Sequence, residues 1–259
     1  MLFGKSLTRS WLTSWVAALY IFLYAPIIVL VLYSFNKGGF PDAWRGFSLD
    51  WYYDLFHSVE IWRACKYSLF VAIVSAALSV LLSICLVYGV RFYNRSIVSL
   101  FYSTALVPDI VLAVGLLSLF AYFWIPLGLT TLIAGHTILG LGFTVPVIKT
   151  RYDELDASLI EASLDLGATS KYTFFHIIIP FLYPAILVAY LLAFIISLDD
   201  FLIAFFCAGS SVQTLSLYIF SMIHSGICPT VNALSTIMLL MSGIAVVVSM
   251  RYSIIMQKR

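Results

Sequence analysis

Residues 151–180 read RYDELDASLIEASLDLGATSKYTFFHIIIP and lie between two long apolar segments. Apolar side chains recur in the first half at helical spacing, which predicts an amphipathic helix rather than a membrane span. They are Leu155, Leu159, Ala162 and Leu166. We expect Gly167 to end this helix, because glycine adopts the left-handed conformation readily. We expect Thr169 or Ser170 to cap a second short helix that runs toward Pro180. Two short helices bent at a glycine would form a compact knob that suits a groove in another protein, although an ordinary interfacial helix–turn–helix fits the same pattern.

The composition is that of a polytopic membrane protein. Of 259 residues, 63% are hydrophobic and 10% are charged, and the mean hydropathy is +1.05. A soluble domain of this length would carry far more charge. We therefore expect an all-α fold with a single transmembrane domain over residues 1–259. Six stretches are long and apolar enough to cross about 30 Å of hydrocarbon as helices, namely 12–35, 67–90, 97–124, 130–149, 181–207 and 231–250.

Lys and Arg are distributed unevenly between the two sides of the membrane. With a cytoplasmic N-terminus, ten of them fall on the inner side and four on the outer side. The positive-inside rule then places both termini and the loop 150–180 in the cytoplasm. The inner residues are Lys5, Arg9, Arg91, Arg95, Lys149, Arg151, Lys171, Arg251, Lys258 and Arg259, and the outer ones are Lys37, Arg45, Arg63 and Lys66.

Sequence motifs for catalysis or cofactor binding are missing. Gly4-Lys5-Ser6 is similar to the end of a phosphate-binding loop, but the required upstream glycine would precede residue 1. No nucleophile elbow, zinc-protease motif or dinucleotide fingerprint occurs. We therefore expect a chain that is no enzyme and binds no metal or cofactor, so that any ATP it uses is bound by another chain. The residues interpreted as structural are Cys65, Cys85, Cys207, Cys228, His57, His136, His176 and His224.

Three carboxylates interrupt the apolar spans: Asp109, Asp199 and Asp200. An ionised Asp in the middle of a membrane costs about 2.5–3.5 kcal/mol, so each needs a local reason. At about 1.5 Å per helical residue, Asp109 lies about 18 Å from the inner boundary and the other two about 22–24 Å. Asp109 follows Pro108 and fits a second interpretation, the start of a new helix. Asp199 and Asp200 differ by about 100° around a helix, so we expect only one of them to face a pore and the other to pair with Ser197 or a partner subunit.

The inner loop resembles a known motif. Glu161-Ala162-Ser163, Gly167 and Ile177 to Pro180 are similar to the Glu-Ala-Ala…Gly…Leu-Pro loop of binding-protein-dependent ABC importer permeases, by which the membrane subunit engages its ATPase. Ser163 stands where this motif commonly has alanine, and the bulky stretch from Phe201 to Phe206 also departs from the family pattern. Further stretches resemble the spermidine/putrescine permeases of this superfamily: Ser34-Phe35-Asn36, Gly46-Phe47-Ser48, Trp51-Tyr52, Pro108-Asp109-Ile110-Val111, Ser197-Leu198-Asp199-Asp200 and Val231-Asn232-Ala233-Leu234.

The resemblance implies a type I ABC importer permease (MetI-like) fold in the inner membrane of a bacterium. It implies a second homologous permease, two copies of an ATPase that binds ATP-Mg, and a periplasmic polyamine-binding protein, with no role for nucleic acid. A polyamine in a pathway of low dielectric constant needs fixed negative charge and aromatic faces to replace its water. The implied pathway residues are Asp109, Asp199 and Asp200, and the implied ATPase-coupling residues are Glu161, Ala162, Ser163, Gly167 and Pro180.

Three other functions remain open at this point. An importer for another solute, such as iron or thiamine, would share the inner loop. A cation-coupled secondary carrier could use Asp109 and Asp199 as relay sites, and internal inverted repeats, which are not apparent, would favour it. In a structural membrane subunit without a pathway, the aspartates would affect assembly and not transport.

Overall fold

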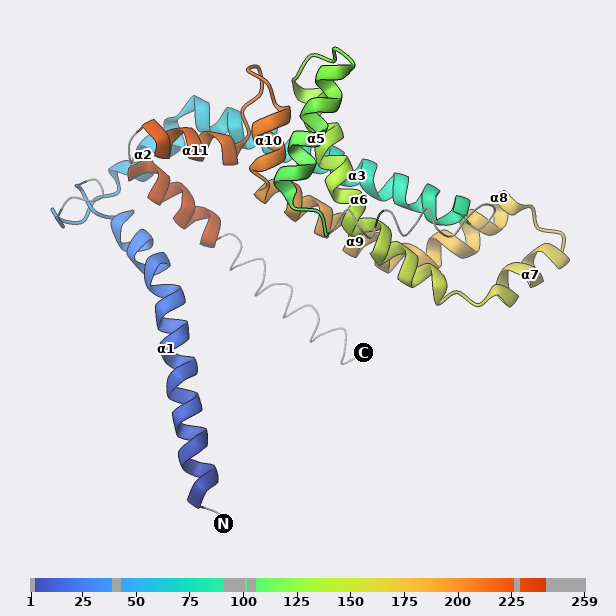
Figure 1. Ribbon diagram of the computed structural model, residues 1–259, viewed down its shortest axis with the longest axis horizontal. Coiled ribbons are helices and arrows are strands. Elements are labelled where there is room, and N and C mark those ends of the chain that lie inside the picture. The colour runs from blue at the N-terminus through green and yellow to red at the C-terminus, as the bar shows by residue number, and fades with distance from the viewer. Residues whose placement is uncertain (1–2, 39–42, 91–100, 102–105, 226–228, 241–259) are drawn as a thin grey trace. The chain divides into compact units, whose positions relative to one another are not determined.

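The computed structural model describes residues 3–38, 43–90, 101, 106–225 and 229–240 (Figure 1). Every regular element in these ranges is a helix, which confirms the all-α prediction. The elements are α1 (Phe3–Tyr33), α2 (Asp50–His57), α3 (Val59–Val90), α5 (Asp109–Tyr122), α6 (Leu129–Asp153), α7 (Ala157–Asp165), α8 (Ser170–Thr173), the π-helical turn η1 (Phe174–Ile178), α9 (Ile179–Asp199), α10 (Leu202–Cys207) and α11 (Leu215–Ser225), with a further helix at Pro229–Leu240.

Four helical runs in the described part of the chain are long and apolar enough to cross a membrane. They match four of the six expected spans and are Trp11–Tyr33, Val59–Gly89, Leu129–Asp153 and Ser170–Asp199. The other two expected spans, 97–124 and 231–250, lie partly outside the described residues. Their described parts are the shorter apolar helices Asp109–Tyr122 and Pro229–Leu240.

The expected span 181–207 is not one helix. It ends at Asp199, and Asp200 has an extended backbone with φ −66° and ψ 130° before α10 begins. The Ser216 hydroxyl donates to the Asp200 carbonyl oxygen at 2.8 Å. The Ala204 amide donates to the Asp200 carboxylate at 3.1 Å. These contacts satisfy backbone groups that the break leaves without helical partners.

The chain divides into two compact units, one of residues Met1–Ile61 with Ile219–Arg259 and one of Trp62–Tyr218. In the first unit, the loop before α2 is organised around Asn36, which is fully buried. The Asn36 side-chain oxygen accepts a hydrogen bond from the Arg45 amide at 2.8 Å, and the Trp51 indole donates to the Asn36 carbonyl oxygen at 2.8 Å. The Phe35 and Phe47 rings stack, with centroids 5.4 Å apart. Three of the stretches with a family resemblance thus form one small structure.

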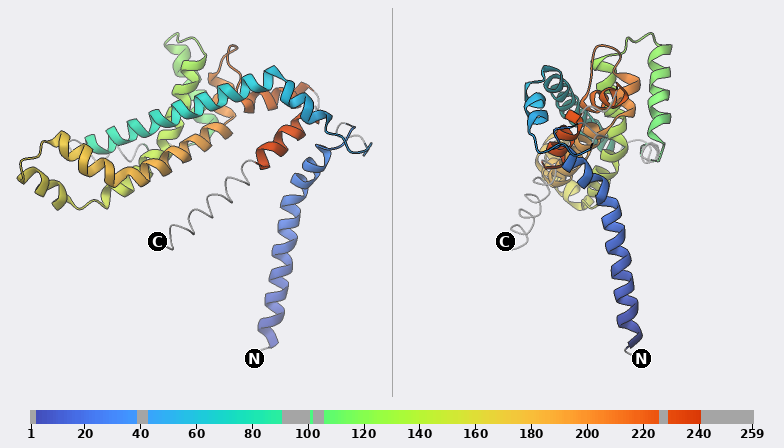
Figure 2. Two further views of the ribbon diagram at one scale, coloured as in Figure 1. Left: turned by 180° about the vertical axis from the view of Figure 1, so that it is seen from behind. Right: turned by 90° about the vertical axis from the view of Figure 1, so that its left-hand side faces the viewer.

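The second unit is built on the long helices α3, α6 and α9 (Figure 2). Hydroxyl groups join α3 to α6: Ser79 donates to the Thr137 carbonyl oxygen at 2.9 Å, and Ser83 and Thr144 share a hydrogen bond of 2.6 Å. A Cβ atom on Gly140 would lie 2.4 Å from the Ser79 hydroxyl, so the two helices require glycine here. Small residues that allow such close approach are typical of helix packing in membranes.

The inner loop is anchored to the same core. Ile160 of α7 and Ile178 of η1 are buried in one hydrophobic cluster with residues of the long helices. This burial fixes the position of the loop relative to α3, α6 and α9. The other buried members of the cluster are Val80, Val87, Leu141, Val145, Ile148, Leu182 and Ala189.

Candidate functional site

The inner loop has the predicted bend. Gly167 has a φ of +85°, the left-handed conformation that favours glycine. The Thr169 hydroxyl accepts the Tyr172 amide at 3.3 Å and caps α8. At the start of α7, the Asp156 carboxylate accepts the Ser158 amide at 2.9 Å, and this backbone N–H holds the pKa of Asp156 below its ordinary value. The prediction of two short helices joined at a glycine is confirmed, although α8 continues through η1 into α9 without a break.

Most of the predicted apolar face of the loop is exposed in this chain, whereas Leu155 is half-buried and packs against the hydrophobic cluster. Leu159 and Leu166 are 51% and 90% exposed, whereas Ile160 and Ser163 are the buried residues of α7. A groove of about 630 Å³ runs between α7 and α8. Its lining is mostly apolar and consists of Leu159, Ala162, Ser163, Leu166, Gly167, Ala168, Thr169, Tyr172 and Ile177.

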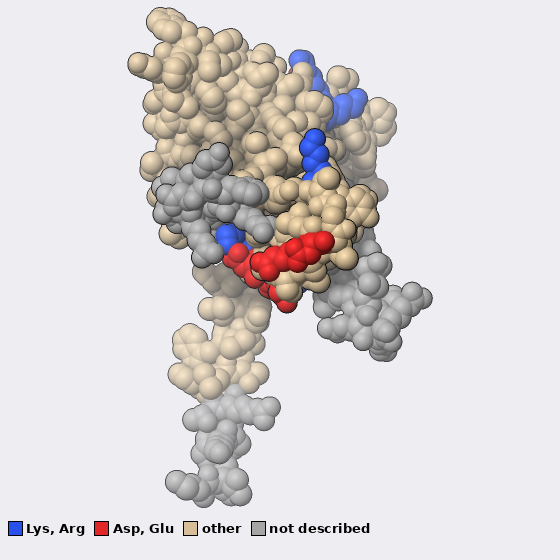
Figure 3. Space-filling model, turned by 90° about the vertical axis from the view of Figure 1, so that its right-hand side faces the viewer, with Lys and Arg blue, Asp and Glu red and all other residues tan. Residues whose placement is uncertain are grey.

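Acidic side chains surround this end of the molecule. Figure 3 shows Asp and Glu side chains beside one another on the surface here. Lys149 pairs with Asp153, and Arg151 pairs with Glu154 at 2.6 Å. The exposed acidic residues from the end of α6 to the end of α7 are Asp153, Glu154, Asp156, Glu161 and Asp165.

Two contacts fix the geometry of the loop. The Arg151 guanidinium lies 4.1 Å from the centroid of the Phe181 ring and joins the end of α6 to the start of α9. The hydroxyls of Ser163 and Thr173 share a buried hydrogen bond of 2.9 Å across the bend. Ala162, Ser163 and Gly167 of the predicted coupling residues line the groove, whereas Glu161 is exposed on α7 and Pro180 is exposed at the start of α9, outside the groove lining.

The three aspartates predicted to line a pathway share one pocket. Asp109, Asp199 and Asp200 line a pocket of about 340 Å³ that we call the acidic pocket. Asp109 is the first residue of α5, so a helix does begin after Pro108. Asp199 and Asp200 both reach the pocket because α9 ends between them, and the expected angle of about 100° between two helical neighbours does not apply. The remaining lining residues are Leu139, Phe143, Ile196, Phe201 and Leu202.

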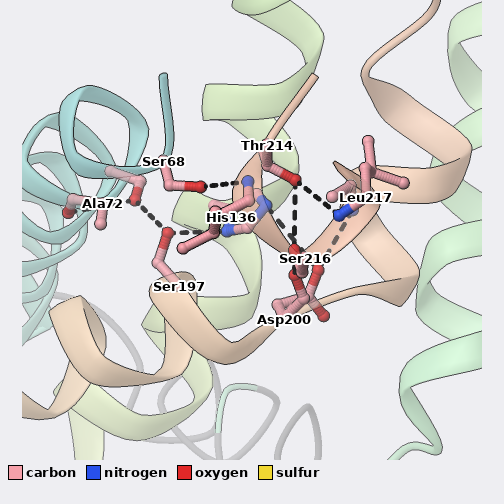
Figure 4. A network of polar contacts seen from close by, with 11 residues as sticks. Ser68, Ala72, His136, Ser197, Asp200, Thr214, Ser216 and Leu217 are labelled. Carbon is pink, nitrogen blue, oxygen red and sulfur yellow. Dashed lines mark hydrogen bonds and ion pairs between the residues drawn. The ribbon is translucent and has the colours of Figure 1, made fainter. Parts of the chain in front are cut away.

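The carboxylates differ in their surroundings. Asp109 and Asp199 are exposed, whereas the side chain of Asp200 is 6% exposed. The Asp200 carboxylate accepts the Ala204 amide of α10, and His136 Nε2 lies 3.7 Å from its Oδ2 atom (Figure 4). The expected pairing of an aspartate with Ser197 is not the contact the structure shows: Ser197 Oγ lies 2.7 Å from His136 Nδ1.

His136 is a residue of this region that the sequence did not reveal. It is 2% exposed on α6 and contacts residues of α9 and of the break that follows. Its partner Ser197 is 61 residues away in the chain. A lone histidine in an apolar segment carries no signal of such a contact.

The chain has clear relatives among bacterial transport proteins. It is 38% identical to the spermidine/putrescine transport system permease protein PotC of Haemophilus influenzae, over 89% of this chain and 91% of the relative. It is 36% identical to PotC of Escherichia coli K12, over 90% of this chain and 89% of the relative. It is 38% identical to the E. coli K12 putrescine transport system permease protein PotI, over 86% of this chain and 83% of the relative. No protein-family model matches the chain.

A solved structure has the same fold. It belongs to a bacterial ABC transporter involved in the import of the acidic polysaccharide alginate, with a TM-score of 0.76 and 15% identity over 96% of this chain and 97% of that chain. The apolar helices are those of a multi-pass membrane protein. The identity of 36 to 38% over most of the chain shows that it belongs to the family of spermidine/putrescine transport system permease proteins.

Proposed function

We propose that this chain is a permease subunit of an ATP-driven polyamine importer in the bacterial inner membrane. It has the type I importer fold with six spans, and both termini and the inner loop lie in the cytoplasm. A second permease forms the pathway with it, and a periplasmic polyamine-binding protein delivers spermidine or putrescine. The relatives named for these two polyamines support the substrate class.

The acidic pocket is the observation that carries this proposal. It gathers three carboxylates and the side chains of Phe143 and Phe201 in one place. An ammonium group that enters a region of low dielectric constant loses its hydration, and a carboxylate replaces it with a charge-assisted hydrogen bond. Aromatic faces add a weaker attraction for cations. A pathway for a neutral solute would gain nothing from three such groups.

The inner loop supports coupling to a separate ATPase. Its apolar groove is exposed in this chain and is surrounded by acidic side chains, as expected of a surface that another protein covers. Two ATPase copies bind ATP-Mg, and one of them docks on this loop. We assign this contact to Glu161, Ala162, Ser163, Gly167 and Pro180. The chain itself catalyses no reaction and holds no cofactor.

Uptake measurements test the proposal. Asp→Asn keeps the size of the side chain and removes its charge, so Asp109→Asn and Asp199→Asn should each lower spermidine and putrescine uptake by about tenfold or more. Asp200→Asn should lower uptake less, because this carboxylate is less exposed. The assay uses labelled polyamines, cells that express the whole complex, and membrane levels checked by blot. Asp54→Asn, at an exposed site on α2, is the matched control.

Three outcomes would contradict the proposal. Unchanged uptake by all three Asn variants at equal expression would exclude the acidic pocket from the pathway and leave the three aspartates with a structural role. Polyamine uptake that persists with a catalytically inactive ATPase would favour a cation-coupled carrier. Uptake of iron or thiamine, and not of polyamines, would assign the chain to another importer of the same superfamily.

A further inference from the structure

A chain of buried polar groups leads from α3 to the acidic pocket (Figure 4). The Ser75 hydroxyl of α3 donates to the Ser197 hydroxyl of α9 at 3.2 Å. Ser197 Oγ lies 2.7 Å from Nδ1 of His136 on α6. The other ring nitrogen of His136, Nε2, lies 3.7 Å from Oδ2 of Asp200. Three helices that are distant in sequence, α3, α6 and α9, thus meet at the break between α9 and α10.

One arrangement of these hydrogen bonds gives the imidazole ring a partner at Nδ1 and directs its proton toward Asp200. A serine hydroxyl carries one hydrogen and accepts through its lone pairs. When the Ser75 hydrogen goes to Ser197 at 3.2 Å rather than to the Ala72 carbonyl oxygen at 3.4 Å, the Ser197 hydrogen is available for Nδ1. The proton of a neutral imidazole then sits on Nε2 and faces Asp200. Nε2 is buried and has no hydrogen-bond partner within the described residues. The distance of 3.7 Å exceeds a hydrogen bond, and a shift of less than about 1 Å would form one.

A buried donor without a partner costs free energy, so a nearby carboxylate oxygen is its natural acceptor. Asp200 Oδ2 already accepts the Ala204 amide. A second donor would hold this carboxylate against α6 and α10. We propose that His136 is a positioning residue: it holds Asp200 at the break and thereby sets the spacing of the carboxylates that meet the substrate. This inference rests on the proposed polyamine transport and names a residue that governs its selectivity.

Two conservative replacements separate this role from a purely structural one. The carboxamide of His136→Gln reaches the position of Nε2, whereas that of His136→Asn reaches only the position of Nδ1. His136→Asn therefore keeps a partner for Ser197 and loses the donor to Asp200. We expect His136→Asn to raise the KM for uptake about fivefold, no more than Asp200→Asn does, and His136→Gln to stay within about twofold of the unaltered complex. A residue that only anchors Ser197 would give the opposite order.

Selectivity gives a second readout that lost stability does not change. Putrescine and spermidine place their amino groups at different spacings, so a displaced Asp200 should change the ratio of their KM values. Loss of folded complex would lower Vmax for both substrates and leave that ratio unchanged. In a complex that already carries Asp200→Asn, adding His136→Asn should alter KM by less than about twofold. The effects of substitutions at two interacting residues are not additive, and the group that His136 holds is already changed.

Ser197→Ala keeps the histidine ring and tests the chain of hydrogen bonds by another route. It removes the hydroxyl that fixes the ring proton and should shift the KM ratio in the same direction as His136→Asn. Ser83→Ala is the matched control, since it also removes a buried hydroxyl contact, on α3 and away from the pocket lining. It should leave both KM values unchanged.

The outcomes distinguish this inference from the proposed function. An unaltered complex that takes up no polyamine would overturn the proposed function. Normal polyamine uptake together with equal KM values for the Gln and Asn variants would overturn the role of His136 alone. An unchanged KM ratio in Ser197→Ala would do the same, even if neither histidine variant assembles.

Discussion

At the scale of one residue, the Ser163 hydroxyl adds a hydrogen bond across the bend of the inner loop. Ser163 is 8% exposed and shares a hydrogen bond of 2.9 Å with Thr173, which also donates to the Thr169 carbonyl oxygen at 3.3 Å. Ser163 differs from the alanine of the loop motif that the sequence resembles. From the sequence, nothing more than tolerance of this small residue was expected, because its partner lies across the bend. The hydroxyl is therefore an extra link between α7 and α8.

Two replacements of Ser163 distinguish the contribution of its hydrogen bond from the contribution of the packing of α7 against α8. Ser163→Ala leaves Thr173 with its second acceptor, so it should cost about 1 kcal/mol or less and preserve coupling. Ser163→Leu overfills a buried site, should cost about 1–3 kcal/mol, and should displace α7 from α8. The measurement is polyamine-stimulated ATP hydrolysis by the reconstituted complex. Normal hydrolysis with Ser163→Leu would show that the seating of α7 is not needed for coupling.

At the scale of elements, the turn between α7 and α8 depends on the backbone of Gly167. Its φ is +85°, and among the described residues no atom beyond its two chain neighbours lies within 4 Å of the position where a Cβ would be. Space is therefore available for a side chain, and the cost of adding one is conformational. That cost is about 1–2 kcal/mol for an ordinary residue in the left-handed conformation, and more for a β-branched one.

Gly167→Ala should therefore impair coupling, and Gly167→Val should impair it more strongly. We expect stimulated ATP hydrolysis and polyamine uptake to fall together, while the amount of protein in the membrane stays the same. Gly89→Ala is the control, because Gly89 is helical and equally free of neighbours, so alanine there should be neutral or slightly stabilising. Full activity of Gly167→Val would remove the bend from the coupling mechanism.

The sequence predicts local elements better than it predicts the break near Asp200. The bend at Gly167 and the cap at Thr169 depend on residues a few positions away, and both were expected. The end of α9 depends on Ser216, 16 residues further along the chain, which donates to the Asp200 carbonyl oxygen. The sequence from Ile195 to Cys207 carries no mark of this contact. Similar depth in two parallel spans predicted that the aspartates lie together, but tertiary contacts decide which of them is buried.

For the whole molecule, the distribution of Lys and Arg predicts which loops face the cytoplasm. Asp54 on α2 and Ser170 on α8 are both exposed and suit chemical labelling. Single cysteines at these positions should react with a membrane-impermeant reagent from opposite sides, Asp54→Cys from the periplasm and Ser170→Cys only after the inner face is opened. The background lacks Cys65, Cys85, Cys207 and Cys228, and the last of these lies outside the described residues.

Labelling of both positions in intact cells would contradict the assignment of opposite sides and remove the inner loop from contact with ATP-binding partners. Labelling at neither position would mean that partner subunits cover both sites. A repeat on the chain expressed alone would distinguish coverage from a wrong orientation.

The π-helical turn Phe174–Ile178 separates the rotational phase of α8 from that of α9. Such a turn holds one residue more than an α-helical turn, and one residue corresponds to about 100° of rotation. Pro180 lies just beyond it and has no amide hydrogen to offer the turn, so a strict α-helix would lose a bond there. The π-helical turn therefore lets Thr173 of α8 face α7 while a different side of α9 packs on α6. A related chain with a one-residue deletion between 174 and 178 would present a different side of its knob to the same ATPase, with every other residue unchanged.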